Sequence, residues 1–236
     1  MEIWKRRNYI KDIKILIELI SEFNIKGEFK GLSDMIEEIE SNQSDILAYN
    51  LNNFSIHIKG AVARAFPKDM HFCKIDLQNT CITKETLNEN FDPLRIYSLD
   101  LQISLFKSEV NNKKEYCSTW HLDREANEAN FAYVHPYYHF QFGGKKHEYL
   151  DPDMAILNSP RIPHPPMDVI LAFHFIINNF VDRKRFEYVD KIKEDVRYKK
   201  IIANSKERLW LSYFKGLSFS TQHNDYKIER LFPLYS

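Results

Sequence analysis

The chain contains little cysteine, no excess of one charge and no long apolar run. Its three cysteines, Cys73, Cys81 and Cys117, are too few and too irregularly spaced for a disulfide framework or a four-cysteine zinc site. Lysine and arginine together number 33, as do aspartate and glutamate, so no overall field attracts the protein to nucleic acid or to an anionic membrane. Any such binding must be local.

Membrane-spanning and secretory patterns are also missing. The longest apolar run, Val169 to Ile177, falls far short of the roughly 20 residues that cross a bilayer. Residues 1–20 mix basic and acidic side chains with apolar ones, unlike the uninterrupted apolar core of a signal peptide. We therefore expect a soluble, cytoplasmic protein that does not bind membranes.

The periodicity of apolar residues predicts an α+β fold, in which an antiparallel β-meander packs on a buried helix and helices stand at both ends. We expect one domain over residues 1–236. It would contain N-terminal helices (1–45), a sheet with the core helix (46–182), and a basic and aromatic helical extension (183–236).

Helical spacing of apolar residues predicts an amphipathic helix at 3–23 and a short acidic helix from Ser33 to Glu40. The segment 169–181 is apolar on nearly every side, which indicates a core helix. A helix with a basic face should follow within 183–208. Asn204 or Ser205 would then cap a last helix that ends at Gly216.

Alternation of apolar and polar residues predicts strands. We expect them at 53–59, 95–106, around 117–123, at 131–142 and at 154–158. Residues 61–93 show no clean period, and the prolines of 160–166 argue against regular structure there.

The dipeptide Asn111-Asn112 can form a two-residue hairpin turn, which would pair Ile103 with Trp120 and Leu101 with Leu122. Because side chains alternate between the faces of a strand, this register divides the polar residues from the apolar ones. On one face we expect Cys117, Thr119, His121, Asp123, Tyr133, His135, Tyr137, His139 and Gln141, and on the core face Val134, Phe140 and Phe142.

Histidines concentrate in this part of the chain. Six of the nine lie between His121 and His174, within or near two unusual runs, 135–144 and 161–168. Histidine titrates near neutral pH, binds metals and transfers protons, so the function should be sought here.

Metal binding is the first interpretation to weigh. His135 and His139 have the i, i+4 spacing of two ligands on a helix, but a strand would separate their Cα atoms by roughly 13 Å. No glutamate follows the first histidine as in the zinc-protease motif. We therefore expect no bound metal and no cofactor. A cross-strand site from His121, Asp123, His135 and His164 is the alternative.

Acid–base hydrolysis of a phosphodiester is the second interpretation. His121 with Asp123 would act as an oriented base, His135 or His139 as the acid, and Arg161 would stabilise an oxyanion. In the competing structural interpretation, the histidines only hydrogen-bond tyrosines and backbone beneath a covering loop.

Residues for binding a partner come from two places. The segment 183–208 carries ten basic and five acidic residues, a balance that suits a phosphate backbone and equally a solvated helix face. The binding candidates on the histidine face and in this segment are Tyr133, Tyr137, His164, Arg183, Lys184 and Arg185.

The two histidine-rich runs resemble uncharacterised bacterial families that share His-Pro-x-x-His, a glycine, Arg-Ile-Pro and a hydrophobic helix. The matching residues are His135-Pro136-Tyr137-Tyr138-His139, Gly143, Arg161-Ile162-Pro163 and the helix through Phe180, about fifty residues in all. Such families are often found among host-defence-like genes, so the resemblance implies a defence role without naming a reaction.

The order of elements is also similar to ubiquitin-conjugating-enzyme-like folds, with an N-terminal helix, a meander, a His-Pro turn and a proline-rich crossing. All three cysteines precede His135, so conjugation by a cysteine after the His-Pro turn is not expected. This resemblance would leave only a binding role.

Two functions follow as expectations. The first is an accessory or scaffold component of a bacterial multi-protein complex, possibly in anti-phage defence, that binds a protein or nucleic-acid partner. The second is a nuclease or phosphodiesterase centred on His121, Asp123, His135, His139 and Arg161. A buried, tyrosine-bonded histidine face would favour the first, and histidines converging on one point in an open cleft would favour the second.

Overall fold

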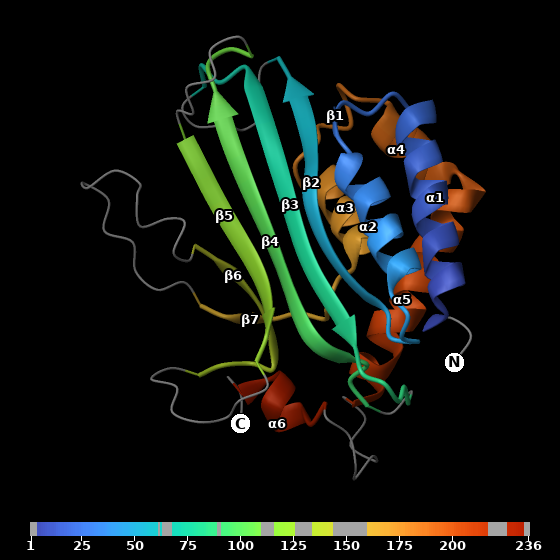
Figure 1. Cartoon of the computed structure of the whole chain (residues 1–236). Helices are drawn as coiled ribbons and strands as arrows, with labels where there is room; N and C mark the ends of the chain where they lie inside the picture. The colour runs from blue at the N-terminus through green and yellow to red at the C-terminus, as the bar shows by residue number, and fades with distance from the viewer. Residues whose placement is uncertain are drawn as a thin grey trace.

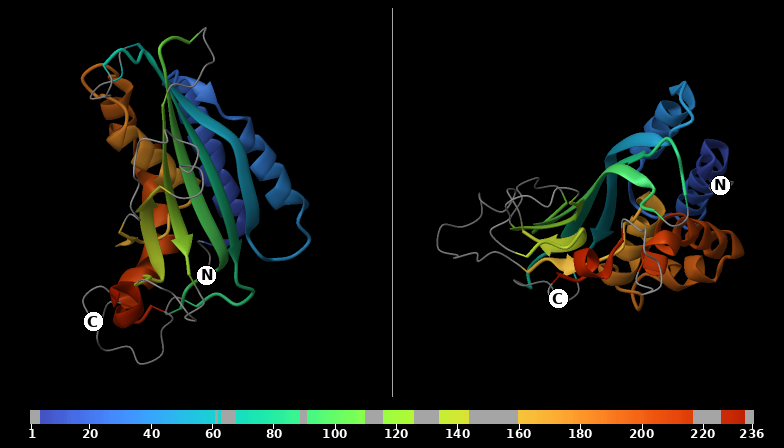
Figure 2. Two further views of the ribbon diagram at one scale, coloured as in Figure 1. Left: turned by 90° about the vertical axis from the view of Figure 1, so that its left-hand side faces the viewer. Right: turned by 90° about the horizontal axis from the view of Figure 1, so that it is seen from below.

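We examined a computed structural model, which describes residues 4–60, 62, 68–88, 91–109, 116–125, 134–143, 160–216 and 226–233. Within these ranges, seven strands form one antiparallel sheet in which each strand pairs with the next along the chain. The helices gather on one side of this sheet (Figures 1 and 2). The predicted α+β meander is therefore confirmed.

The bounds of the elements are as follows. The strands are β1 (Gly27–Glu28), β2 (Ala48–Lys59), β3 (Phe72–Thr83), β4 (Leu94–Phe106), β5 (Tyr116–Arg124), β6 (Tyr138–Phe142) and β7 (Ile162–Pro163). The helices are α1 (Arg6–Glu22), α2 (Lys30–Ser41), α3 (Val169–Asn179), α4 (Tyr188–Glu194), α5 (Val196–Gly216) and α6 (Ile228–Leu231). No helix among the described residues is long and apolar enough to cross a membrane.

The core lies between the sheet and the helices. Alternate residues of the central strands, such as Ile75 on β3 and Leu101 on β4, are buried on the helix side. Each such side chain stabilises the fold by about 1.5–3 kcal/mol. Asp168 starts α3 by accepting hydrogen bonds from the backbone N–H groups of Ile170 and Leu171. The prediction of a buried core helix is confirmed, because most of α3 is shielded from solvent.

The β4–β5 register differs from the prediction by two residues. Leu101 pairs with Trp120, and Leu99 pairs with Leu122. The predicted turn at Asn111-Asn112 lies outside the described residues. Because a slip of two residues keeps every side chain on its own face, the predicted division into an apolar and a polar face holds for β4 and β5.

The strand β3 was not predicted, because residues 61–93 show no clean period. Its core-facing positions include Asn79, which is 1% exposed. The Asn79 side chain accepts a hydrogen bond from the Tyr49 hydroxyl and donates one to the Ser98 carbonyl. A polar residue satisfied in this way can be buried, but it interrupts the apolar alternation that would have revealed the strand.

The third predicted strand, 131–142, is wrong over residues 134–137, which are not paired, and residues 131–133 lie outside the described residues. Among the described residues pairing begins at Tyr138, and Val134 is 49% exposed instead of lying in the core. Phe142 is also 37% exposed, so Phe140 is the one buried residue of the three predicted for the core face. Within the proline-rich segment, Ile162 and Pro163 nevertheless form β7 by pairing with β6. The predicted strand at 154–158 lies outside the described residues.

The helical extension also differs from the prediction. The basic run Arg183–Arg185 precedes α4 instead of lying on a helix. The helical conformation is interrupted between α4 and α5. Asp195 is the N-cap of α5, where its side chain accepts a hydrogen bond from the backbone N–H of Arg197. α5 then continues without interruption through Ser205, and α2 starts at Lys30, three residues before the predicted cap.

Candidate functional site

A polar site lies on the face of β5 and β6 that points away from the core. Across the strands, Asp123 pairs with His139, and His121 pairs with Gln141. On the other side of β5, His121 pairs with Asp100 of β4. Since directly paired residues project from the same face, strand alternation alone gathers these polar side chains.

Three of these side chains could hold one metal ion. One ring nitrogen from each of His121 and His139 and one carboxylate oxygen of Asp123 lie within 4.8 Å of one another. His121 Nε2 is 3.4 Å from Asp123 Oδ2 and 3.3 Å from Gln141 Oε1. The predicted pair of His121 and Asp123 is therefore close enough for the carboxylate to orient the imidazole.

His139 is the most deeply buried member of the site, at 2% exposure. Its Nδ1 lies 3.1 Å from the Pro136 carbonyl oxygen, which can only accept a hydrogen bond, so Nδ1 carries the proton. Burial, the nearby His135 and Arg161 lower the pKa of His139 to about 3. The ring is neutral near pH 7, and its lone pair is on Nε2.

His135 lies against His139, with ring centroids 4.4 Å apart and planes nearly perpendicular. We expected a strand to keep these two residues apart, because four strand residues separate Cα atoms by roughly 13 Å. Their rings are in contact instead. The chain from 134 to 137 is not a strand, and it bends where the Tyr137 N–H donates to Arg230 O and Tyr137 O accepts from the Glu125 N–H. Burial, and then Arg161, lower the pKa of His135.

Arg161 completes the predicted catalytic set. Its positive charge lowers the pKa of both His135 and His139, so it lies in the same electrostatic environment. Its Nε is buried and has no hydrogen-bond partner, one of four such side-chain atoms among the described residues. Buried donors are nearly always paired in native proteins, and a bound anion would satisfy this one.

The surroundings of Asp123 act on its pKa in opposite directions. Burial raises the pKa of this carboxyl, and the negative charges of Asp100 and Glu125 raise it further, while His121 opposes the shift. The structure thus brings His121, Asp123, His135 and His139 together, and the charge of Arg161 acts on the last two. Strand parity places His121, Asp123 and His139, whereas the bend at 134–137 places His135, and Arg161 directly precedes β7, which pairs with β6.

His164, by contrast, does not belong to this site. Its backbone N–H donates to Tyr138 O, and its ring lies 5.6 Å from that of Phe140, on the other face of β6. His164 therefore does not lie beside the other histidines, and a binding role for it stays a prediction. Alternation explains this too, because Phe140 and His139 are successive residues of one strand.

The tyrosine candidates are also placed differently. Tyr133 lies outside the described residues. Tyr137 is buried, and its hydroxyl donates to Asp92 Oδ2 instead of joining the histidines. Asp92 also accepts hydrogen bonds from Tyr138, Tyr226 and Arg124. This buried cluster was not predicted, and its members are too far apart in the sequence to give a local signal.

The basic binding candidates Arg183, Lys184 and Arg185 are exposed and lie just before α4, which stands at the upper right of Figure 1, away from β6 and β7. Arg185 donates a hydrogen bond to Lys59 O and stacks on Phe186, so part of its role is structural. The structure does not bring this run to the histidine site.

No family model, no curated protein and no solved structure matches the chain. The resemblances drawn from the histidine-rich runs therefore stay predictions. Function has to be argued from the geometry of the site.

Proposed function

We propose that the protein is a nuclease or phosphodiesterase whose active site is the group His121, Asp123, His135, His139 and Arg161. The supporting observation is the convergence of His121, Asp123 and His139, whose candidate ligand or acid–base atoms lie within 4.8 Å of one another. The described hydrogen bonds of these histidines go to the Gln141 side chain and to the Pro136 backbone carbonyl, not to tyrosines. The bond to backbone also fits the structural interpretation, so the proposal rests on the convergence of the three residues.

The roles follow from charge and hydrogen bonding. His121, oriented by Asp123, would accept a proton from the attacking water. Arg161 would bind the phosphate and stabilise the charge that develops on it, since a guanidinium fits phosphate oxygens well. His139 and His135 have lowered pKa values and are neutral near pH 7, so we assign them as proton acceptors or ligands, not as the general acid. The leaving oxygen would then take its proton from solvent water.

Hydrolysis of bis(p-nitrophenyl) phosphate and of labelled single- and double-stranded DNA and RNA tests this proposal. We expect turnover by the parent protein and a fall in kcat/KM of about 100-fold or more for Asp123→Asn and for Arg161→Ala. His71→Ala is the matched control, because His71 is exposed and lies outside the site. Absence of turnover by the parent on all substrates, or an equal loss in the control, contradicts the proposal.

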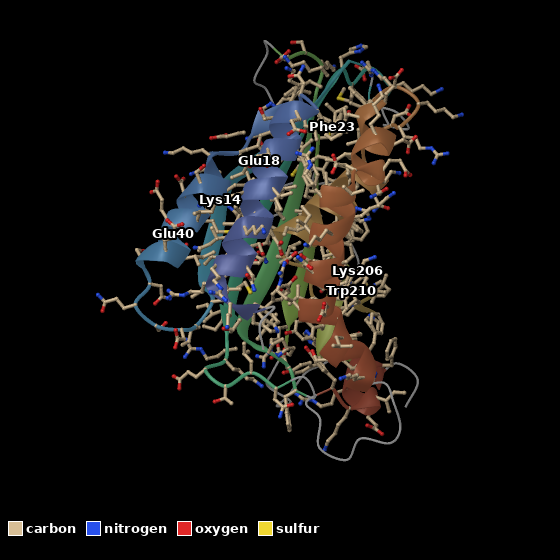
Figure 3. The ribbon with its side chains drawn as sticks, turned by 90° about the vertical axis from the view of Figure 1, so that its right-hand side faces the viewer. Lys14, Glu18, Phe23, Glu40, Lys206 and Trp210 are labelled. Carbon is tan, nitrogen blue, oxygen red and sulfur yellow. The ribbon has the colours of Figure 1, made fainter. Side chains whose placement is uncertain are left out.

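An accessory role is a second candidate, supported by the outer surface of α5. Val196, Leu211 and Phe214 are 78%, 42% and 50% exposed. Leu211 and Phe214 adjoin Trp210, over which the Lys206 ammonium sits at 5.3 Å from the ring centroid (Figure 3). We propose that this surface holds a protein partner in a cytoplasmic bacterial complex of anti-phage defence.

The accessory role is tested by co-purification with tagged protein from the native host. Leu211→Asp with Phe214→Asp should abolish association with a specific partner, and Lys215→Asp, one residue further along α5, should not. For nucleic acid, Arg183→Glu with Lys184→Glu should weaken low-salt binding to all sequences and flatten its salt dependence. Arg185 is not changed, because its side chain donates a hydrogen bond to the Lys59 carbonyl and its loss would disturb the fold as well as the charge. Unchanged association and binding would remove this candidate.

A further inference from the structure

We infer that His121, Asp123 and His139 bind one divalent first-row transition metal ion. The inference rests on the proposed function only for what the ion would do, which is to activate the attacking water and polarise the phosphate. With the ion bound, His121 would be its ligand, and the neutral His135 would accept the water proton instead. It reverses the expectation of no metal. That expectation rested on the separation of His135 from His139, which does not concern this group of three.

The spacing of the ligand atoms is suitable. Ligands about 2.0–2.2 Å from a tetrahedral zinc ion lie about 3.3–3.6 Å from one another. His121 Nε2 and Asp123 Oδ2 are already 3.4 Å apart, and all three residues offer atoms within 4.8 Å. Small side-chain rotations would close the remaining gap without moving the backbone.

The orientation of His139 is that of a ligand. Its Nδ1–H donates to the Pro136 carbonyl, which fixes the tautomer and leaves the Nε2 lone pair for the ion. Metal-binding histidines generally donate their second ring nitrogen to a carbonyl or carboxylate in this way. Asp123 and His139 are also directly paired across β5 and β6, so two of the ligands project from one rigid ladder.

The type of donor set favours a catalytic metal over a structural one. Two imidazoles and one carboxylate leave coordination positions for water and substrate, as in catalytic zinc sites and in non-haem iron sites. The charge balance suits a cation. The carboxylates of Asp100 and Glu125 act on Asp123, and besides His121 the positive charge that acts on it is that of Arg161. An anionic substrate at an open position would meet the unpaired Arg161 Nε.

Metal binding to the full chain tests the inference directly. Protein stripped with chelator would be titrated with zinc chloride, manganese chloride and, without oxygen, iron(II) sulfate, while bound metal is measured after gel filtration. We expect one equivalent of at least one of these ions and a rise in the melting temperature on binding. Asp123→Asn and His139→Asn should weaken binding at least about tenfold, by analogy with the loss of outer-sphere partners.

Asp123 is only partly buried, so Asp123→Asn keeps the test valid even if the buried His139→Asn variant fails to fold. His71→Ala is again the control and should retain full binding. No bound ion above that held by Asp123→Asn would overturn the inference. Stoichiometric metal without hydrolysis would sink the proposed function alone, whereas hydrolysis by a parent protein that takes up none of the three ions would sink the metal site alone.

Discussion

The imidazole of His139 is held in one tautomer by its neighbours. Its Nδ1–H bonds to the Pro136 carbonyl, His135 covers its ring, and the ring of His121 stands 6.4 Å away at a near right angle. A histidine restrained on several sides loses little further freedom when it binds a ligand, which favours both metal coordination and proton transfer. This restraint distinguishes the site from a set of freely solvated histidines.

Outside the site, His174 provides a test of pH dependence. It lies on α3 with Nδ1 3.1 Å from the Tyr198 hydroxyl, and Lys193, Lys199 and Lys206 line the same pocket. Burial, and then Lys206 and Lys193, lower the pKa of His174 below its usual 6.5. The unfolded chain therefore takes up a proton as pH falls below about 6.5 while folded His174 stays neutral, and stability is lost on acidification.

We predict that His174→Gln makes the unfolding free energy fall less steeply between pH 7.5 and pH 5 than it does in the parent protein. Urea unfolding at several pH values measures this. Burial also lowers the pKa values of His57 and His164, so only the difference between variant and parent is informative. His71→Gln, at an exposed position, should leave the slope unchanged. Parallel curves for His174→Gln and parent would contradict the prediction.

Strand alternation made most of the site predictable. The β4–β5 register slipped by two residues from its predicted value, and an even slip moves no side chain to the other face. His121, Asp123 and His139 therefore share a face as expected. A register shift of one residue would have placed them in the core. The predicted faces therefore hold for any register that differs from the true one by an even number of residues.

Bends of the chain could not be predicted in the same way. The contact between His135 and His139 depends on the turn through Pro136 and Tyr137, which is fixed by hydrogen bonds to Glu125 and Arg230. Arg230 lies 93 residues after Tyr137 in the sequence, so no local pattern predicts the hydrogen bond between them. The strand β3 was hidden for a related reason, since buried Asn79 finds its partners on β2 and β4.

Helix boundaries show how tertiary contacts override local signals. Ser205 was expected to cap a helix, but it is buried inside α5, and its hydroxyl donates to Asp168 Oδ2. Asp195, a good N-cap residue in its own right, marks the real start of α5. Serine and aspartate are both common N-cap residues. The sequence alone does not show that Ser205 bonds Asp168 from within α5 while Asp195 caps its start.

At the scale of the whole molecule, two buried carboxylates join distant segments. Asp92 accepts a hydrogen bond from Tyr226, 134 residues later, and so ties the C-terminal segment to the chain just before β4. Asp12 on α1 accepts one from Arg208 on α5, 196 residues later. Such pairs give no periodic signal, which is why the sequence predicted the layers but not the contacts that hold them together.

Arg208 is the centre of the contact between the helices. Its side chain is 1% exposed, its Nη1 is 2.8 Å from Asp12 Oδ2, and its Nη2 is 3.5 Å from Asp168 Oδ2, the carboxylate that caps α3. The guanidinium also lies over the Tyr9 ring at 4.9 Å from its centroid. One cation therefore compensates two buried anions from α1 and from the start of α3.

We predict that Arg208→Met lowers the free energy of unfolding by about 3–5 kcal/mol, because methionine fills much of the space but leaves both carboxylates buried without their charge partner. Urea unfolding monitored by circular dichroism measures the loss. Lys206→Met, two residues away on the exposed side of α5, should change stability by no more than about 0.5 kcal/mol. If Arg208→Met instead costs under about 1 kcal/mol, as for an exposed ion pair, the network does not hold the helices together and packing of the apolar core does so alone.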